Sequence, residues 1–197
     1  MPLDGLLAPL TKLTALHVNF PAADDTAPPL PASLTRLTAL RDLDLMCFHP
    51  PSHQHQLRSL LAPLTQLTAL TVPMIVDGSS RLPDLPSLQS LDIARVADGG
   101  FALLAASCPA LVSLSCCRVA IGATDAAARL PALTSLACWT DFTVAPSARA
   151  QFSLAACAPA LKSLRGCSQL RAHGGALTCD GPADGPVRAA AAPCQDL

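Results

Sequence analysis

The chain has 197 residues, a mass of 20.2 kDa and a formal net charge of −1, and charged residues make up only 14% of it. This near-neutral balance excludes the broad basic surface of a nucleic-acid-binding protein. Scarce charge together with a mean hydropathy of +0.41 excludes intrinsic disorder for the chain as a whole. Leucine and alanine dominate, with 35 and 36 residues, and the length suits one domain with its own core.

Neither the membrane nor the secretory pathway is indicated. No 18 consecutive residues are apolar, so the sequence predicts no transmembrane helix. The first residues carry an acid ahead of a very short apolar run, which does not fit a signal peptide. The nine cysteines are odd in number and irregularly spaced, which favours reduced thiols. We therefore expect an intracellular, cytoplasmic protein.

A unit of the form Leu-x-x-Leu-x-x-Leu-x-Leu, with conservative replacements, recurs along the chain. Its third position falls at Leu16, Leu43, Leu70, Leu91, Leu114, Leu136 and Leu164. These positions are 27, 27, 21, 23, 22 and 28 residues apart, within the period of leucine-rich repeats. The last two positions of a unit are two residues apart, so in a strand Leu43 and Leu45 point inward while Asp44 faces out.

These units resemble leucine-rich repeats over roughly residues 3–170. The resemblance implies an α/β solenoid, a right-handed superhelix of about seven repeats with a concave parallel β-sheet and an irregular or helical convex side. Residues 30–40 resemble the plant and bacterial type of repeat, whereas residues 98–111 resemble the cysteine-containing repeat of F-box substrate receptors. An array of amphipathic helices is the alternative, but prolines such as Pro63, Pro86 and Pro109 lie beside the key leucines and disfavour it.

Local signals predict the elements between the strands. We expect a helix over residues 101–107 with Asp98 as its N-cap, and further helix starts at Thr124 and Ser147. Residues 81–90 contain two prolines and should lack a helix. Three segments are expected to be loops between repeats: Pro21–Pro29, His49–Gln56 and Asp141–Pro146.

The asparagine that the family places three positions beyond the last inward leucine is missing. Those positions hold Pro21, Phe48, Ile75, Val96, Val119, Asp141 and Gln169. Backbone groups that an asparagine ladder would bind must therefore find other partners or water. We expect a less regular curvature and modest stability.

We assign residues 1–170 to the repeat domain and residues 171–197 to a low-complexity tail rich in Ala, Gly and Pro, which we expect to be disordered. The chain begins almost inside its first unit, without a separate capping segment. Solenoids require such caps. A fragment of a longer protein is therefore an open alternative.

Candidate chemistry is sparse. Cys47, His49, His53 and His55 lie within nine residues and could in principle hold zinc, but no CxxC pair accompanies them, and we interpret the segment as a solvated loop. Cys116 and Cys138 occupy inward leucine positions and are expected to pack as small apolar residues. Hydrolase, P-loop, zincin and dinucleotide-binding motifs are absent, so we expect no enzyme, no catalytic residue, no cofactor and no metal.

Outward positions of the predicted strands are mostly small and polar. The candidate partner-binding residues on this concave face are His17, Asp42, Asp44, Asp92, Trp139 and Arg165. Trp139 is the single tryptophan of the chain, and tryptophan is enriched at interface hot spots; the alternative is that it packs against a neighbouring strand. Small side chains suit a broad protein contact better than a small-molecule pocket.

The expected function is a non-enzymatic scaffold that binds another protein on the concave face, with no nucleic acid, membrane or small-molecule substrate as partner. Three alternatives stay open. The cysteine-containing repeats favour a substrate-recognition module of a ubiquitin ligase, which needs an F-box that these residues do not contain. A cytoskeletal or cilium axoneme scaffold is the second alternative. A metal-binding protein built on the loop from His49 to His55 is the third.

Overall fold

The computed structural model describes residues 3–19, 31–46, 54–80, 82–145, 147 and 153–166. Within them the chain forms, in order and with η denoting a 3-10 helix, α1 (Leu3–Leu7), β1 (Ala15–Asn19), η1 (Ala32–Arg36), β2 (Asp42–Met46), α2 (Gln54–Leu61), β3 (Ala69–Val76), β4 (Ser90–Val96), α3 (Gly100–Ser107), β5 (Ser113–Ile121), η3 (Ala123–Ala127), β6 (Ser135–Val144), α4 (Leu154–Cys157) and β7 (Ser163–Arg165). The predicted tail over residues 171–197 lies outside the described residues.

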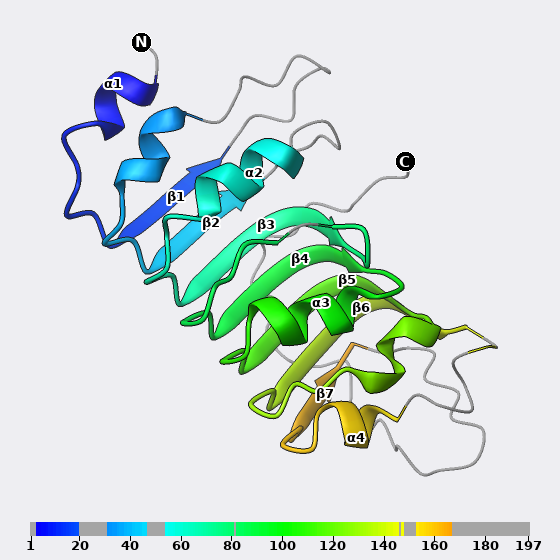
Figure 1. Cartoon of the computed structure of the whole chain (residues 1–197). Coiled ribbons are helices and arrows are strands. Elements are labelled where there is room, and N and C mark those ends of the chain that lie inside the picture. The colour runs from blue at the N-terminus through cyan, green and yellow to red at the C-terminus, as the bar shows by residue number, and fades with distance from the viewer. Residues whose placement is uncertain are drawn as a thin grey trace.

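All seven strands join one open, parallel sheet, and their order in the sheet is their order in the chain (Figure 1). The strands align at the third position of each sequence unit, where Leu16 pairs with Leu43, Leu43 with Leu70, and so on to Leu136 with Leu164. The predicted parallel sheet and its register are therefore confirmed.

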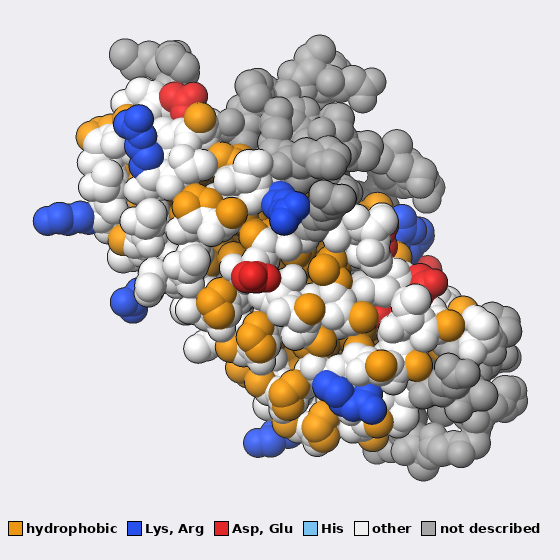
Figure 2. All heavy atoms as spheres, viewed as in Figure 1, with side chains coloured by type: hydrophobic (Ala, Val, Ile, Leu, Met, Phe, Trp, Pro, Cys, Tyr) orange, Lys and Arg blue, Asp and Glu red, His pale blue; other side chains and the backbone are white. Residues whose placement is uncertain are grey.

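The helices cover one face of this sheet, and the core lies between them and the strands (Figure 1). Inward strand residues such as Leu91 and Leu114 are buried together with Phe101 and Leu104 from α3. Each such side chain stabilises the fold by about 1.5–3 kcal/mol before the entropy of ordering is subtracted. Figure 2 shows the side that carries α2 and α3, where isolated charged side chains lie among hydrophobic and uncharged ones.

The same backbone turn precedes each strand. In the turn before β2, the Leu40 N–H donates to the Leu37 carbonyl at 2.9 Å, and an equivalent bond precedes each of the other described strands. The residue just before a strand then accepts two successive N–H groups of the next unit, as the Thr68 carbonyl does from Gln89 at 2.8 Å and Ser90 at 2.9 Å. Five further pairs of strands are joined in the same way, so the strands start in line with one another.

β3 to β6 continue for several residues beyond their inward leucine positions. Val76, Val96, Val119 and Phe142 pair in register on β3 to β6 and are buried, so this part of each strand continues the apolar core. Backbone groups beyond them bond to the adjacent strand, as in the 2.8 Å bond from the Ala97 N–H to the Val76 carbonyl. In β3 to β6 these bonds provide partners for backbone groups beyond the inward leucine positions, whereas Pro21, Phe48 and Gln169 lie outside the described residues.

The start of α3 differs from the prediction. Its N-cap is Gly99, at φ 79°, where a side chain would be strained and would also clash with Gly78. Asp98 does not cap the helix; its carboxylate instead accepts a hydrogen bond from Thr124 Oγ1 at 2.6 Å. Sequence spacing pointed to Asp98 because caps are usually local, whereas here the next unit along the chain supplies the cap.

Asp125 is that cap. Its side chain is fully buried, and its two oxygens accept the backbone N–H groups of Gly99 at 3.0 Å, Phe101 at 3.0 Å, Ala102 at 3.3 Å and Gly122 at 3.1 Å. Three of these donors lie at the start of α3, where a helix leaves N–H groups without intrahelical partners. One carboxylate thereby links two neighbouring units.

Two further local predictions need correction. The loop expected over Asp141–Pro146 is wrong, because β6 continues to Val144 alongside β5. The loop expected over His49–Gln56 gives way to α2 at Gln54, and residues 47–53 lie outside the described part. The helix start expected at Ser147 is followed by residues 148–152, which lie outside the described part; α4 begins after Ser153, whose hydroxyl accepts the Ala156 N–H.

The two ends of the sheet are less covered than its middle. Leu10, expected to point inward, is 44% exposed, and Leu16, Val18, Leu161 and Leu164 are only partly buried. Each end strand has a neighbouring strand on one side only in the sheet, so its inward side chains receive contacts from one direction. Among the described helices, none has the length and apolar character needed to cross a membrane.

Candidate protein-binding face

The sheet face opposite the helices, called the open face below, carries a row of side chains aligned across all seven strands. This row, called the central row, consists of His17, Asp44, Thr71, Asp92, Ser115, Ala137 and Arg165. Four of the six residues predicted to bind a partner belong to it, and Asp42 lies two residues before Asp44 on β2. The confirmed register therefore brings these predicted residues onto one surface.

The β1–β2 end of the row is acidic. The His17 ring lies between two carboxylates, with Nδ1 3.4 Å from Asp44 Oδ2 and Nε2 3.9 Å from Asp42 Oδ2. The His17 side chain is 64% exposed, whereas that of Asp44 is 25% exposed. The other Asp44 oxygen, Oδ1, is buried and accepts no hydrogen bond from any described residue. An unsatisfied acceptor of this kind costs free energy, and because this atom is buried, only the remainder of the Asp44 side chain can be reached from outside.

Asp92 lies two strands farther along the row, and its side chain is exposed. Partial desolvation by the surrounding strands raises the pKa of Asp92, and the charge of Asp44 raises it further, while the Ser115 hydroxyl lowers it. Desolvation and a like charge both disfavour the ionised carboxylate. A cation placed beside Asp92 would oppose both effects.

Trp139 is exposed on this face and also held in place. Its side chain is 61% exposed, and its indole Nε1 donates a hydrogen bond to Ser115 Oγ at 3.1 Å. The bond draws the indole from β6 across to the neighbouring strand β5, beside the central row. The two predicted possibilities, contact with a partner and packing against a neighbouring strand, are therefore not exclusive in this geometry.

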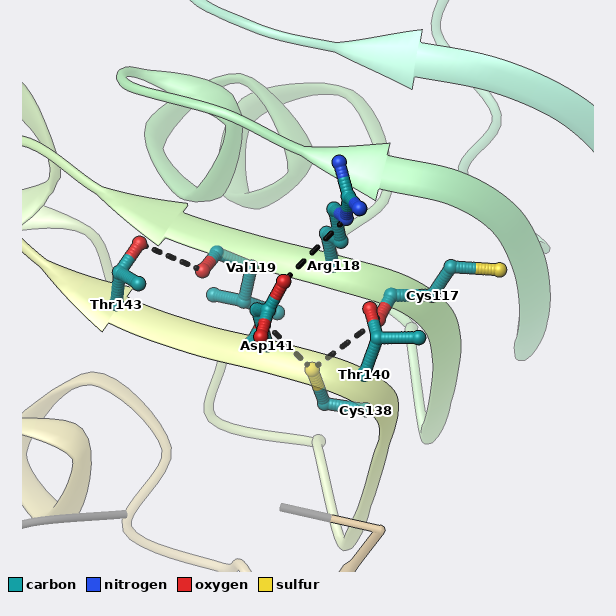
Figure 3. Close-up of polar contacts among 7 residues, drawn as sticks. All are labelled: Cys117, Arg118, Val119, Cys138, Thr140, Asp141 and Thr143. Carbon is teal, nitrogen blue, oxygen red and sulfur yellow. Dashed lines mark hydrogen bonds and ion pairs between the residues drawn. The ribbon is translucent and has the colours of Figure 1, made fainter. Parts of the chain in front are cut away.

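An ion pair on the same face was missed by the sequence analysis. Arg118 Nε lies 3.4 Å from Asp141 Oδ2, and the two side chains face each other between β5 and β6 (Figure 3). Strict alternation after the inward Cys116 would turn Arg118 inward. The register shifts at this point, however, so that Arg118, two residues after Cys116, pairs with Asp141, three residues after Cys138. Such a bulge turns a side chain to the other face, and no residue type in this stretch predicts the bulge.

The basic groups of the open face lie away from the central acids. Arg95 and Arg118 pair in register near the carboxyl ends of β4 and β5, and Arg165 ends the row on the exposed strand β7. The face is therefore acidic over β1 to β4 at the level of the central row, and basic toward its far strand and its strand ends.

The cysteines of the core behave as packed apolar residues. Cys116 and Cys138 are buried in adjacent inward positions, and the hydrogen bond between their side chains, together with burial, raises the pKa of Cys116. Cys138 Sγ also donates to the Asp141 carbonyl at 3.1 Å, next to the bond from Thr140 Oγ1 to the Cys117 carbonyl (Figure 3). Protonated, buried thiols are poor nucleophiles.

No cluster of metal-ligating side chains occurs among the described residues. The candidate zinc ligands Cys47, His49 and His53 lie outside them, and the side chain of His55 is not described. Comparisons with protein-family models, with curated proteins and with solved structures find no match to this chain. Function is therefore argued from the open face alone.

Proposed function

We propose that the chain is a right-handed leucine-rich repeat solenoid of about seven repeats, and that it is a non-enzymatic scaffold that binds another protein on its open face, the concave side of such a solenoid. The observation that carries the functional part is the exposed Trp139, held beside the central row, whose side chains are polar on every strand except β6. Tryptophan is the residue type most enriched among binding hot spots.

The solenoid is supported by structure that recurs with the sequence unit. The same turn precedes each strand, and the same double hydrogen bond joins each strand start to the next. The strands follow one another in chain order, so that each unit contacts its sequence neighbours. An arrangement in which units contact only their neighbours is typical of repeat proteins.

A protein partner is favoured over a small molecule by the character of the face. Its side chains at the starts of the strands are serines, alanines and aspartates, as at Ser90, Ser113 and Ser135, and these leave the backbone accessible to a broad, flat contact. Small-molecule sites are instead concave and mostly apolar. Trp139 would provide the buried anchor, and the polar side chains of the central row part of the polar rim.

The test is capture of partners from cell extract by the full chain, compared with Trp139→Ala and with Leu6→Ala. Leu6 is an exposed apolar side chain on α1, 57% exposed, and so controls for loss of apolar surface elsewhere. We expect proteins captured by the parent chain to be retained by Leu6→Ala and lost by Trp139→Ala, with unchanged circular dichroism in both variants. Equal capture by Trp139→Ala, or loss of folded signal on its introduction, would overturn the assignment of the face.

A further inference from the structure

We propose that the segment bound by the open face is an extended basic peptide, with one Lys or Arg side chain held between Asp92 and the indole of Trp139 and a second one at Asp44. This inference deepens the proposed function and rests on it. It follows from charge complementarity and from the spacing of the groups across the sheet.

The acids of the central part of the face have an imidazole as their ion-pair neighbour. Asp42, Asp44 and Asp92 lie on β2 and β4, and the neighbouring basic group among the described residues is the exposed His17. Asp44 Oδ1 is buried and accepts no hydrogen bond within the described part of the chain. A partner ammonium or guanidinium group can bond to the exposed part of these carboxylates, and hydrogen bonds between charged groups are the strongest available to it.

Trp139 and Asp92 together form the site of the other cation. The indole bonds to Ser115 on β5, and Ser115 is the register partner of Asp92 on β4, so an aromatic ring and a carboxylate flank one serine. A cation that lies over an indole face is attracted by the ring, and most strongly by tryptophan. The same cation can bond to the carboxylate, and guanidinium has the flat shape suited to both contacts.

The separation of the two acids across the sheet sets the spacing of the basic residues in the peptide. Neighbouring strands lie about 4.8 Å apart, so Asp44 and Asp92, two strands apart in the central row, are separated by roughly 10 Å. An extended chain in the polyproline II conformation, with three residues per turn and a rise of about 3.1 Å per residue, covers that distance in about three residues and turns side chains three positions apart to the same side. We therefore expect basic residues at positions i and i+3 of the bound segment.

The basic groups of the face limit where this segment can lie. Arg95 and Arg118 lie near the carboxyl ends of their strands, and Arg118 already pairs with Asp141. Arg165 lies on β7, beyond Trp139. A basic peptide is therefore confined to the central row between β2 and β6, where it crosses the strands.

The experiment uses the full chain and a displayed library of random linear dodecapeptides. We expect the selected peptides to carry two Lys or Arg residues three positions apart, and fluorescence anisotropy of a labelled selected peptide to show affinity that falls with added salt. Asp92→Asn and Trp139→Ala should each weaken binding by roughly tenfold. Asp84→Asn is the charge-matched control, because Asp84 is an exposed acid between β3 and β4, and it should leave the affinity unchanged.

The outcomes separate this inference from the function on which it rests. Selection of acidic or uncharged peptides whose binding still depends on Trp139 overturns the basic partner and leaves the protein-binding face intact. If basic peptides are selected but Asp84→Asn lowers their affinity as much as Asp92→Asn does, the chain attracts them through its negative charge in general. That result overturns the inference. Peptides that bind independently of Trp139, Asp92 and Asp44 overturn both proposals.

Discussion

Replacement of Asp125 by alanine should destabilise the chain more than any other single change of a charged residue described above. The substitution removes the acceptor of four backbone N–H groups, three of them at the start of α3, in a site with no exposure to water. At about 1 kcal/mol for each donor left without a partner, the free energy of unfolding falls by about 4 kcal/mol. For a chain of this length that corresponds to a melting temperature lower by roughly 8–16 °C.

Urea and thermal unfolding followed by circular dichroism measure this loss. Asp125→Asn keeps the shape of the side chain and one acceptor oxygen, so we expect about half of the effect. Asp84→Asn, an exposed acid, should stay within about 0.5 kcal/mol of the parent chain. Equal stability of Asp125→Asn and Asp84→Asn would refute the idea that this carboxylate joins two neighbouring units.

Three further expectations test the core and the titrating groups. Leu114→Asp should unfold the chain, because an unpaired acid enters the shared core, whereas Ser113→Asp on the open face should stay soluble and folded; equal behaviour in urea would contradict the register. Asp92→Asn should have the same free energy of unfolding as the parent chain below the pKa of an unfolded aspartate, about 3.9, and a higher one near neutral pH. The reason is that the raised pKa of Asp92 makes the parent chain lose stability as the pH rises. A variant that is less stable than the parent chain near neutral pH would contradict this. Burial raises the pKa of Cys108 to about 12 and that of Cys157 to about 11, so both should resist iodoacetamide until urea unfolds the chain, and rapid native labelling seen by mass spectrometry would show otherwise.

The architecture of the sheet was predictable because its signal repeats. Leucine spacing alone placed the aligned positions from Leu16 to Leu164, and the pairing of those residues confirms each of them. A strand alternates its side chains between two faces, so the same register also placed His17, Asp44, Asp92 and Arg165 in one row. All six candidate residues were assigned to the face by this alternation, and four of them share the central row.

The remaining features each occur once and do not repeat with the sequence unit. The cap of α3 comes from Asp125, 26 residues beyond Gly99, and local capping rules look only within one turn. The ion pair of Arg118 with Asp141 depends on a bulge, which breaks the alternation used to assign faces. The partial exposure of Leu10 and Leu16 reflects their place at the edge of the sheet, which a unit-by-unit pattern does not encode.

The central claim, that a partner binds the open face at Trp139, can be measured directly, because Trp139 is the only tryptophan of the chain and its fluorescence reports on this one place. The measurement is acrylamide quenching of that fluorescence, with and without a saturating amount of a tryptophan-free peptide selected on the full chain. The account predicts that binding shields the exposed indole, lowers the quenching constant several-fold and shifts the emission to shorter wavelength. Saturated binding that leaves the quenching constant and the emission unchanged would contradict it.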